Sequence, residues 1–159
     1  GQLTIMCGGD AAAFARVEPL LACYGRMARL MGPAGHGQLT KMVNQICIAG
    51  LVQALAEGIS FAQAAGLDPN AVVEVISKGA AQSWQMENRA GTMAAGKFDF
   101  GFAVEWMRKD LRICLDTARE TGAQLPVTAL VDQFYADVEA MGGARWDTSS
   151  LIARLARRS

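Results

Sequence analysis

The chain has 159 residues, of which 52% are hydrophobic, and its 15 basic residues balance 15 acidic ones. This composition supports one well-packed domain with room for part of a second, and it excludes a disordered chain. No block of one charge sign occurs, so nothing favours nucleic acid as a partner, because such binding depends on clustered Lys and Arg.

The first thirty residues alternate between strand and helix patterns. LTIMC at 3–7 is a short apolar run, residues 10–25 have helical spacing despite Pro19, and residues 26–32 are again extended. Such β-α-β alternation belongs to α/β domains. Three short elements cannot form a covered parallel sheet, and no G-x-G-x-x-G motif follows a strand. We interpret this segment as the tail of an α/β domain.

A long helix is predicted from about Gln38. The apolar residues between Leu39 and Ile59 form a stripe with further apolar residues around it, which is typical of a helix buried on several sides. We expect this helix to be central and to end at Gly66. Its most apolar run, residues 46–52, is far shorter than the roughly 20 apolar residues of a membrane span, so no membrane segment is expected.

Shorter helices are predicted to follow. Asp68 and Pro69 have the chemistry of an N-cap and a first helical residue. A helical stretch near 83–96 is interrupted by Gly91. An aromatic loop, KFDFGF, is then followed by helices predicted at 104–120, at 127–141 and after a cap at Asp147.

The cysteines give no sign of a metal site or a disulfide framework. They are far apart, form no C-x-x-C pair, and the chain has a single histidine, His36, to complete a metal shell. The N-terminal residues also lack the features of a signal peptide. We expect reduced thiols in a cytoplasmic protein without a metal.

A glycine-rich loop precedes the long helix, in the stretch GPAGHGQLTKMVNQ at 32–45. Gly32, Gly35 and Gly37 allow positive φ, which is typical of a hinge or a tight loop. A helix N-terminus beside such a loop also offers unpaired N–H groups and a positive dipole end to an anionic group such as a carboxylate. Both interpretations are compatible with the sequence.

Polar residues occupy the first turns of that helix. Lys41 is unfavourable for the helix dipole there, so a role in solubility explains it poorly. A partly buried lysine at this place is suited to proton transfer. Asn44 and Gln45 share its helix face, and the three side chains together can hold a small polar substrate. Alternatively, they are a polar helix end that faces a neighbouring domain.

Two motifs carry a resemblance to a known family. The loop and helix start resemble the G-x-x-G-x-G-x-x-x-K signature of the β-hydroxyacid dehydrogenases, with Lys41 in register as the lysine. MRKDL at 107–111 is similar to the family's K-D-L segment. The resemblance implies a mainly α fold: the all-helical C-terminal domain of the 6-phosphogluconate dehydrogenase-like type at 32–159, after a short β-α-β remnant of an NAD(P)-binding Rossmann domain at 1–31.

The resemblance also implies roles around Lys41. This residue matches the catalytic lysine, a general acid when the carbonyl is reduced and a general base in the oxidation. The family has a substrate-binding asparagine four residues later, where this chain has Gln45, and its asparagine, Asn44, comes one residue earlier. We therefore expect Gly35, Asn44 and Gln45 to bind substrate, with the division between the two amides left open. The K-x-x-N-Q form resembles the tartronate semialdehyde reductase branch.

A second set of residues is implied to meet NAD or NADP. Lys109 matches the lysine that approaches the nicotinamide, and Asp110 is similar to a position that supports the site. Phe102, Trp106 and Lys109 are spaced so that one helix face would present aromatic surface and a cation, provided the helix extends back to Phe102. The alternative for Phe102 and Trp106 is ordinary core packing.

The implied function is hydride transfer between NAD(P) and a small β-hydroxyacid of the 3-hydroxyisobutyrate or tartronate semialdehyde type. The family's dinucleotide fingerprint does not occur in these residues, so we expect the chain to present half an active site and to show no turnover alone. Family members associate through the helical domain, which predicts a homo-oligomer. The alternative is a non-catalytic helical dimerisation or interaction module of the same fold.

Overall fold

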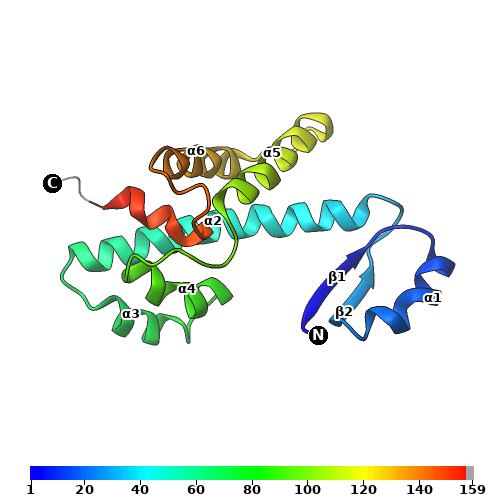
Figure 1. The fold of residues 1–159 in the computed structure, drawn as a ribbon, viewed down its shortest axis with the longest axis horizontal. Helices are drawn as coiled ribbons and strands as arrows, with labels where there is room; N and C mark the ends of the chain where they lie inside the picture. Colours follow the sequence, from blue (N-terminus) through cyan, green and yellow to red (C-terminus); the bar gives the residue numbers. More distant parts are fainter. Residues whose placement is uncertain (157–159) are drawn as a thin grey trace. The chain divides into compact units, whose positions relative to one another are not determined.

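The computed structural model describes residues 1–156, which divide into two compact units, Gly1–Gln45 and a second that begins at Ile46. The sequence-based boundary lies before the glycine loop, whereas this division falls within a helix. In chain order the elements are β1 (Leu3–Cys7), α1 (Ala11–Leu21), β2 (Gly25–Leu30), α2 (His36–Ala64), α3 (Pro69–Ile76), α4 (Trp84–Ala94), α5 (Val104–Thr121), α6 (Pro126–Ala140) and the 3-10 helix η1 (Thr148–Leu155) (Figure 1).

The first unit is the predicted β-α-β arrangement followed by the start of α2. β1 and β2 pair in parallel, with Cys7 opposite Leu30, and α1 connects them. The Asp10 side chain caps α1 by accepting a hydrogen bond from the Ala13 N–H at 2.8 Å. Pro19 lies inside the last turns of α1, as expected. The β-α-β prediction is therefore confirmed at the level of its elements.

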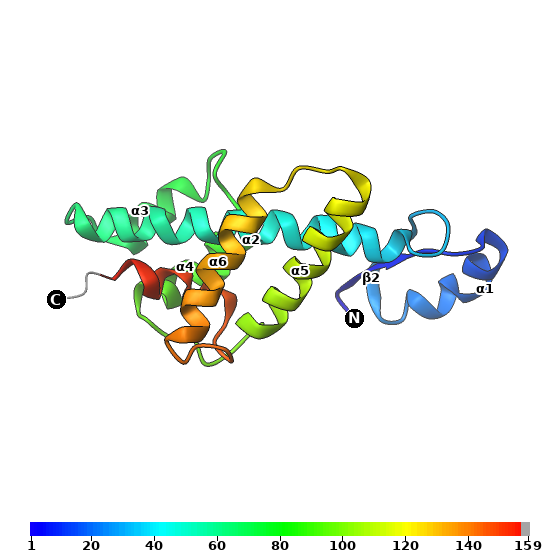
Figure 2. The same cartoon turned by 90° about the horizontal axis from the view of Figure 1, so that it is seen from above.

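The second unit is helical. α5 and α6 lie on one side of its part of α2, and α3 and α4 lie on the other (Figures 1 and 2). Its core joins buried side chains of α2, α4, α5, α6 and η1, among them Val52, Met93, Leu111, Tyr135 and Leu151. The apolar spacing of each helix explains this, because residues three or four apart share a face. The mainly helical prediction agrees with the structure.

Two local predictions are corrected. α4 continues through Gly91 to Ala94, because an isolated glycine weakens a helix but does not end it. The left-handed Gly96, with φ of 65°, follows its end. The last helix is a 3-10 helix, and Asp147 caps it as expected, by accepting a hydrogen bond from the Ser149 N–H at 3.0 Å.

The apolar part of α2 extends well beyond residues 46–52, the run on which the membrane prediction was based. The helix is long and apolar enough to cross a membrane by length and composition, with a mean hydropathy of 1.4 over its best window. A core helix of a globular domain shares this property, and 44% of that window is buried within the protein. The expectation that no segment reaches the required length was wrong, and the absence of a membrane partner stays a prediction.

Candidate functional site

The glycine loop has two kinds of glycine. Gly32 and Gly35 adopt φ of 138° and 94°, a region that favours glycine. Gly37 does not, although the sequence interpretation grouped it with them. A Cβ on Gly37 would lie 2.5 Å from the Met6 carbonyl oxygen, and one on Gly8 would lie 2.8 Å from the Gly37 nitrogen. Gly37 is therefore required because the helix start touches the end of β1.

Backbone hydrogen bonds join the loop to the segment that follows β1 and to the first turn of α2. Gly9 N–H donates to the Gly32 carbonyl at 2.9 Å, and Leu39 N–H donates to that of Gly35 at 3.0 Å. A Cβ on Gly35 would meet nothing within 4 Å, so open space lies beside the first turn of α2. A small anionic group fits the chemistry of this place, where the helix dipole is positive.

Lys41, Asn44 and Gln45 form one hydrogen-bonded cluster in the first turns of α2. The Gln45 Oε1 atom accepts a hydrogen bond from Lys41 Nζ at 2.9 Å and another from Asn44 Nδ2 at 2.9 Å. Gln45 is 3% exposed, Asn44 is half-buried and Lys41 is exposed. The prediction that the three side chains share a face agrees with this arrangement.

The exposure of Lys41 differs from the partial burial that we expected. Helical position, on which that expectation was based, does not determine how deeply a side chain is buried. The amine keeps its hydrogen bond to Gln45 and reaches solvent beside the helix start. It is therefore accessible to a substrate that arrives at this face.

On α5, Lys109 lines a polar groove of about 560 Å³ between α5 and α6, together with Arg108, Arg112 and Asp132. The Lys109 side chain is 55% exposed, and its Nζ lies 2.9 Å from Asp110 Oδ1. Arg108 is held by Asp132 at 3.2 Å and by Glu139. Lys109 thus presents an accessible cation, as a contact with a dinucleotide requires.

The buried face of α5 carries Cys114. Burial raises the pKa of this thiol, and the charge of Asp110 adds to the effect. All four cysteines are free thiols in the structure, as expected. Within residues 1–156 no three His, Cys, Asp or Glu side chains gather as a metal site.

The predicted aromatic face begins before the helix. α5 starts at Val104, so Phe102 lies in the aromatic loop and not on the helix. Its ring nevertheless meets that of Trp106 edge-on, with 5.9 Å between centroids. Phe102 packs partly against the core, whereas Trp106 is 47% exposed. The condition that the helix extends back to Phe102 is therefore not met, and the two rings meet through the loop instead.

The aromatic loop is held by Asp147, which the sequence identified only as a cap. Asp147 is 1% exposed, and its carboxylate accepts hydrogen bonds from Arg89 Nε at 3.2 Å and from the Phe102 N–H at 2.9 Å. The guanidinium of Arg89 also lies over the rings of Trp84 and Phe100. Sequence spacing gave no signal for this contact, because Arg89 and Asp147 are 58 residues apart.

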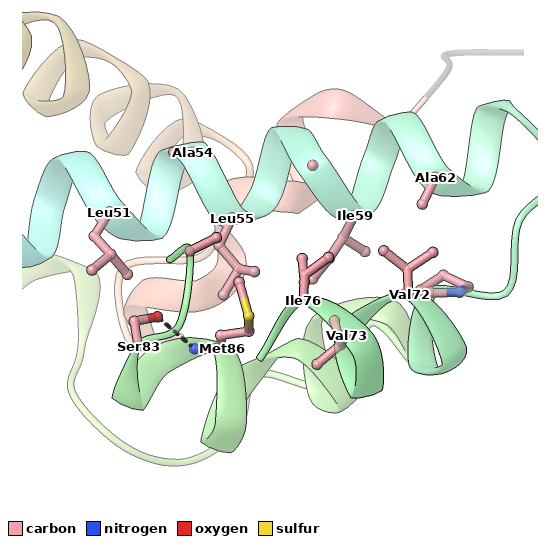
Figure 3. Close-up of a pocket in the computed structure, with 13 residues that line it drawn as sticks. Leu51, Ala54, Leu55, Ile59, Ala62, Val72, Val73, Ile76, Ser83 and Met86 are labelled. Carbon is pink, nitrogen blue, oxygen red and sulfur yellow. Dashed lines mark hydrogen bonds between the residues drawn. The ribbon is translucent and has the colours of Figure 1, made fainter. Parts of the chain in front are cut away.

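An apolar groove lies elsewhere in the second unit and contains none of the predicted site residues. Its volume is about 430 Å³. Figure 3 shows side chains of α2 and α3 that line it: Leu51, Leu55, Ile59, Val72, Val73 and Ile76. The hydroxyl of Ser83, also in its lining, accepts a hydrogen bond from the Met86 N–H at 3.1 Å as the cap of α4. This lining does not suit a small charged substrate.

Comparisons with known proteins agree with this picture. The family described as "NAD-binding of NADP-dependent 3-hydroxyisobutyrate dehydrogenase" matches residues 35–155. An uncharacterized oxidoreductase of Shewanella frigidimarina is 68% identical over 98% of the chain and 53% of its own length. The 2-hydroxy-3-oxopropionate reductase of Escherichia coli is 37% identical over 98% of the chain and 53% of its length.

A solved structure shows the same fold. The 3-hydroxyisobutyrate dehydrogenase of Salmonella typhimurium superimposes with a TM-score of 0.86 at 28% identity, over 95% of this chain and 53% of that one. The chain thus spans about half the length of the relatives that it matches.

Proposed function

Because the chain belongs to the NAD-binding family of NADP-dependent 3-hydroxyisobutyrate dehydrogenase, we propose that it supplies the proton-transfer half of a hydroxyacid dehydrogenase site. The whole protein would interconvert a small β-hydroxyacid, of the 3-hydroxyisobutyrate or tartronate semialdehyde type, and its semialdehyde in the cytoplasm. The family binds NAD or NADP, which supplies or accepts the hydride when bound. The chain alone would show no turnover.

Lys41 is the proposed acid and base. In the reduction, its ammonium group donates a proton to the carbonyl oxygen as that oxygen gains charge, and in the oxidation its amine removes the hydroxyl proton. An exposed amine that is held by the Gln45 amide in the first turns of α2 suits both steps. The substrate carboxylate would lie near the Gly35 backbone at the positive end of α2, with Asn44 and Gln45 on the amide side of the site.

Three residues of the second unit are the proposed cofactor contacts. Lys109 offers an accessible cation, and Asp110 holds its amine at 2.9 Å. Phe102 would support the Trp106 ring, because the two rings are in contact. The exposed face of Trp106 and the Lys109 ammonium suit the ring and the polar groups of a nicotinamide nucleotide.

The observation that carries the proposal is the Lys41 amine, held at 2.9 Å by an amide at the start of α2, within the matched family region. The test is a fusion of the chain to the part of the E. coli reductase that it does not match. We expect oxidation of NAD(P)H at 340 nm with 2-hydroxy-3-oxopropionate. Lys41→Ala should lower kcat by about 10² to 10⁴, whereas Lys78→Ala should not. Unchanged turnover of folded Lys41→Ala would remove the assignment.

We also infer that copies associate through the helical unit, as the resemblance implies. This unit leaves large apolar side chains exposed, including Phe61 at 72% and Val75 at 73%. Such surface is more often found at interfaces than on monomers. Analytical ultracentrifugation should show a concentration-dependent oligomer, and a monomer at all concentrations would contradict this.

The competing function is a helical interaction module without chemistry. Such a module has no need for a lysine at the positive end of α2, where a cation is electrostatically unfavourable. The Lys41→Ala fusion distinguishes the two functions directly, because a module would lose nothing in that variant.

A further inference from the structure

Gln45 is expected from the family pattern to contact substrate, but its contacts fit another role. We propose that Gln45 is a positioning residue that orients the amine of Lys41 and the amide of Asn44 toward the substrate. This inference rests on the proposed function of Lys41. It assigns Gln45 a role that acts through its two neighbours.

The first argument is the use of the Gln45 oxygen. An amide oxygen has two lone pairs, and Oε1 accepts one hydrogen bond from Lys41 Nζ and one from Asn44 Nδ2, both at 2.9 Å. Its acceptor capacity is thereby used within the cluster. A substrate hydroxyl group could bind this oxygen only by displacing one of these donors.

The second argument is burial. Gln45 is 3% exposed, whereas Asn44 is half-buried and Lys41 is exposed. Exposure thus increases from the acceptor to the two donors that it holds. The atoms that an incoming substrate meets belong to Lys41 and Asn44, and Gln45 lies behind them.

The third argument is the charge of the acceptor. A lysine that exchanges a proton must remain in place both as an ammonium and as an amine. A neutral amide oxygen accepts an N–H from either form, so Lys41 stays oriented through the cycle. A carboxylate at the same distance would favour the ammonium form and oppose release of its proton. A glutamine can therefore hold the Lys41 amine in place without favouring its ammonium form.

The first experiment uses the 159-residue chain labelled with ¹³C-lysine. The chain has four lysines, Lys41, Lys78, Lys97 and Lys109, so the other three serve as internal references for the Cε signals. In Gln45→Glu, the Lys41 signal should shift from its wild-type position at neutral pH, because the new carboxylate faces the ammonium. The references should not move. In Gln45→Met, which keeps the volume but lacks the oxygen, only the Lys41 signal should change.

The second experiment places both variants in the fusion with the E. coli reductase. We expect Gln45→Met to lower kcat about tenfold with little change in KM, because the amine is present but no longer oriented. Gln45→Glu should move the basic limb of the pH–rate profile upward. Circular dichroism of each variant establishes that the helices remain folded.

The outcomes separate this inference from the function on which it rests. If the Lys41 signal behaves like the reference signals in both variants, or if Gln45→Met raises KM and leaves kcat unchanged, Gln45 does not position the amine. If the Lys41 signal responds but Lys41→Ala retains turnover in the fusion, the contact is real and the proposed chemistry is wrong.

Discussion

The substitution Asp147→Asn removes one charge from the buried contact that holds the aromatic loop. The asparagine has nearly the shape of the aspartate, so the change tests hydrogen bonding and charge with little effect on packing. The aspartate oxygens accept hydrogen bonds from Arg89 Nε at 3.2 Å, the Ser149 N–H at 3.0 Å and the Phe102 N–H at 2.9 Å. An asparagine has one acceptor oxygen and presents an NH₂ donor on the other side.

The magnitude follows from these contacts. If the amide oxygen keeps the two donors on Oδ1, the NH₂ group faces the Phe102 N–H, and a donor left unsatisfied costs about 1–3 kcal/mol. Arg89 also loses the charge of its partner. Because the Arg89 side chain is 21% exposed and keeps part of its hydration, we reduce this contribution to about 1 kcal/mol. The helical unit should lose about 2–4 kcal/mol of unfolding free energy in total.

Urea unfolding followed by tryptophan fluorescence measures this loss. Trp84, Trp106 and Trp146 all belong to the second unit, so their emission reports on that unit alone. With an m-value of about 2 kcal/mol/M, the midpoint should fall by about 1–2 M.

The matched control is Asp116→Asn, which removes the same charge from an exposed pair with Arg119 on α5. Its effect should stay within about 0.5 kcal/mol. If Asp147→Asn is no more destabilising than this control, the buried carboxylate does not organise the loop and the reasoning fails.

Three further predictions concern the helices and the titrating groups. Gly37→Ala should destabilise the first unit by about 1–3 kcal/mol, because its Cβ would press on the strand backbone. Gly58→Ala in the same helix meets nothing within 4 Å, so it should stabilise the protein by about 0.5–1 kcal/mol and raise its melting temperature. Thermal unfolding followed by circular dichroism distinguishes the two variants. Burial raises the pKa of Tyr135 far above its usual value, so absorbance at 295 nm should show one tyrosine that ionises only on unfolding. Because the unfolded state releases this proton from about pH 10, stability should fall by about 1.4 kcal/mol per pH unit above that value, and a Tyr135→Phe variant should lack this part of the loss. A thiol reagent should modify the exposed Cys47 rapidly and the buried Cys114 only after unfolding, so equal rates in the folded chain would contradict the burial of α5.

Local signals in the sequence predicted most of the elements, apart from the course of α4 through Gly91 and the 3-10 form of the last helix. Asp10, Asp68 and Asp147 each cap the helix that follows, because a side-chain oxygen just before a helical pattern satisfies an unpaired N–H there. Gly122 ends α5 with φ of 79°, as a glycine after a helical run predicts. Such signals depend on residues within one or two turns of each other, so a single sequence contains them in full.

The interpretation of two glycines failed, for different reasons. Gly91 lies inside α4 without ending it. Gly37 is required by the approach of β1, although a single sequence makes it resemble a residue chosen for positive φ. The contact of Asp147 with Arg89 is likewise determined by the fold, since no local rule relates residues so far apart. Sequence patterns indicated which residue types mattered at these positions but not the physical reason.

The candidate site shows the same division between pattern and contact. Periodicity placed Lys41, Asn44 and Gln45 on one face of α2, and the structure agrees. Periodicity does not show how deeply a side chain is buried, so it could not distinguish the buried Gln45 amide from the exposed Lys41 amine.

Two separate physical requirements explain why the loop before α2 contains so many glycines. Gly37 must lack a side chain because the helix start touches the backbone of β1. Gly35 has open space around its Cβ direction, so its glycine is required by φ and leaves room beside the helix dipole. Only the first demand concerns packing between elements. The open space at Gly35 is therefore not a consequence of the packing against β1, which is why we relate it to the approach of a substrate carboxylate.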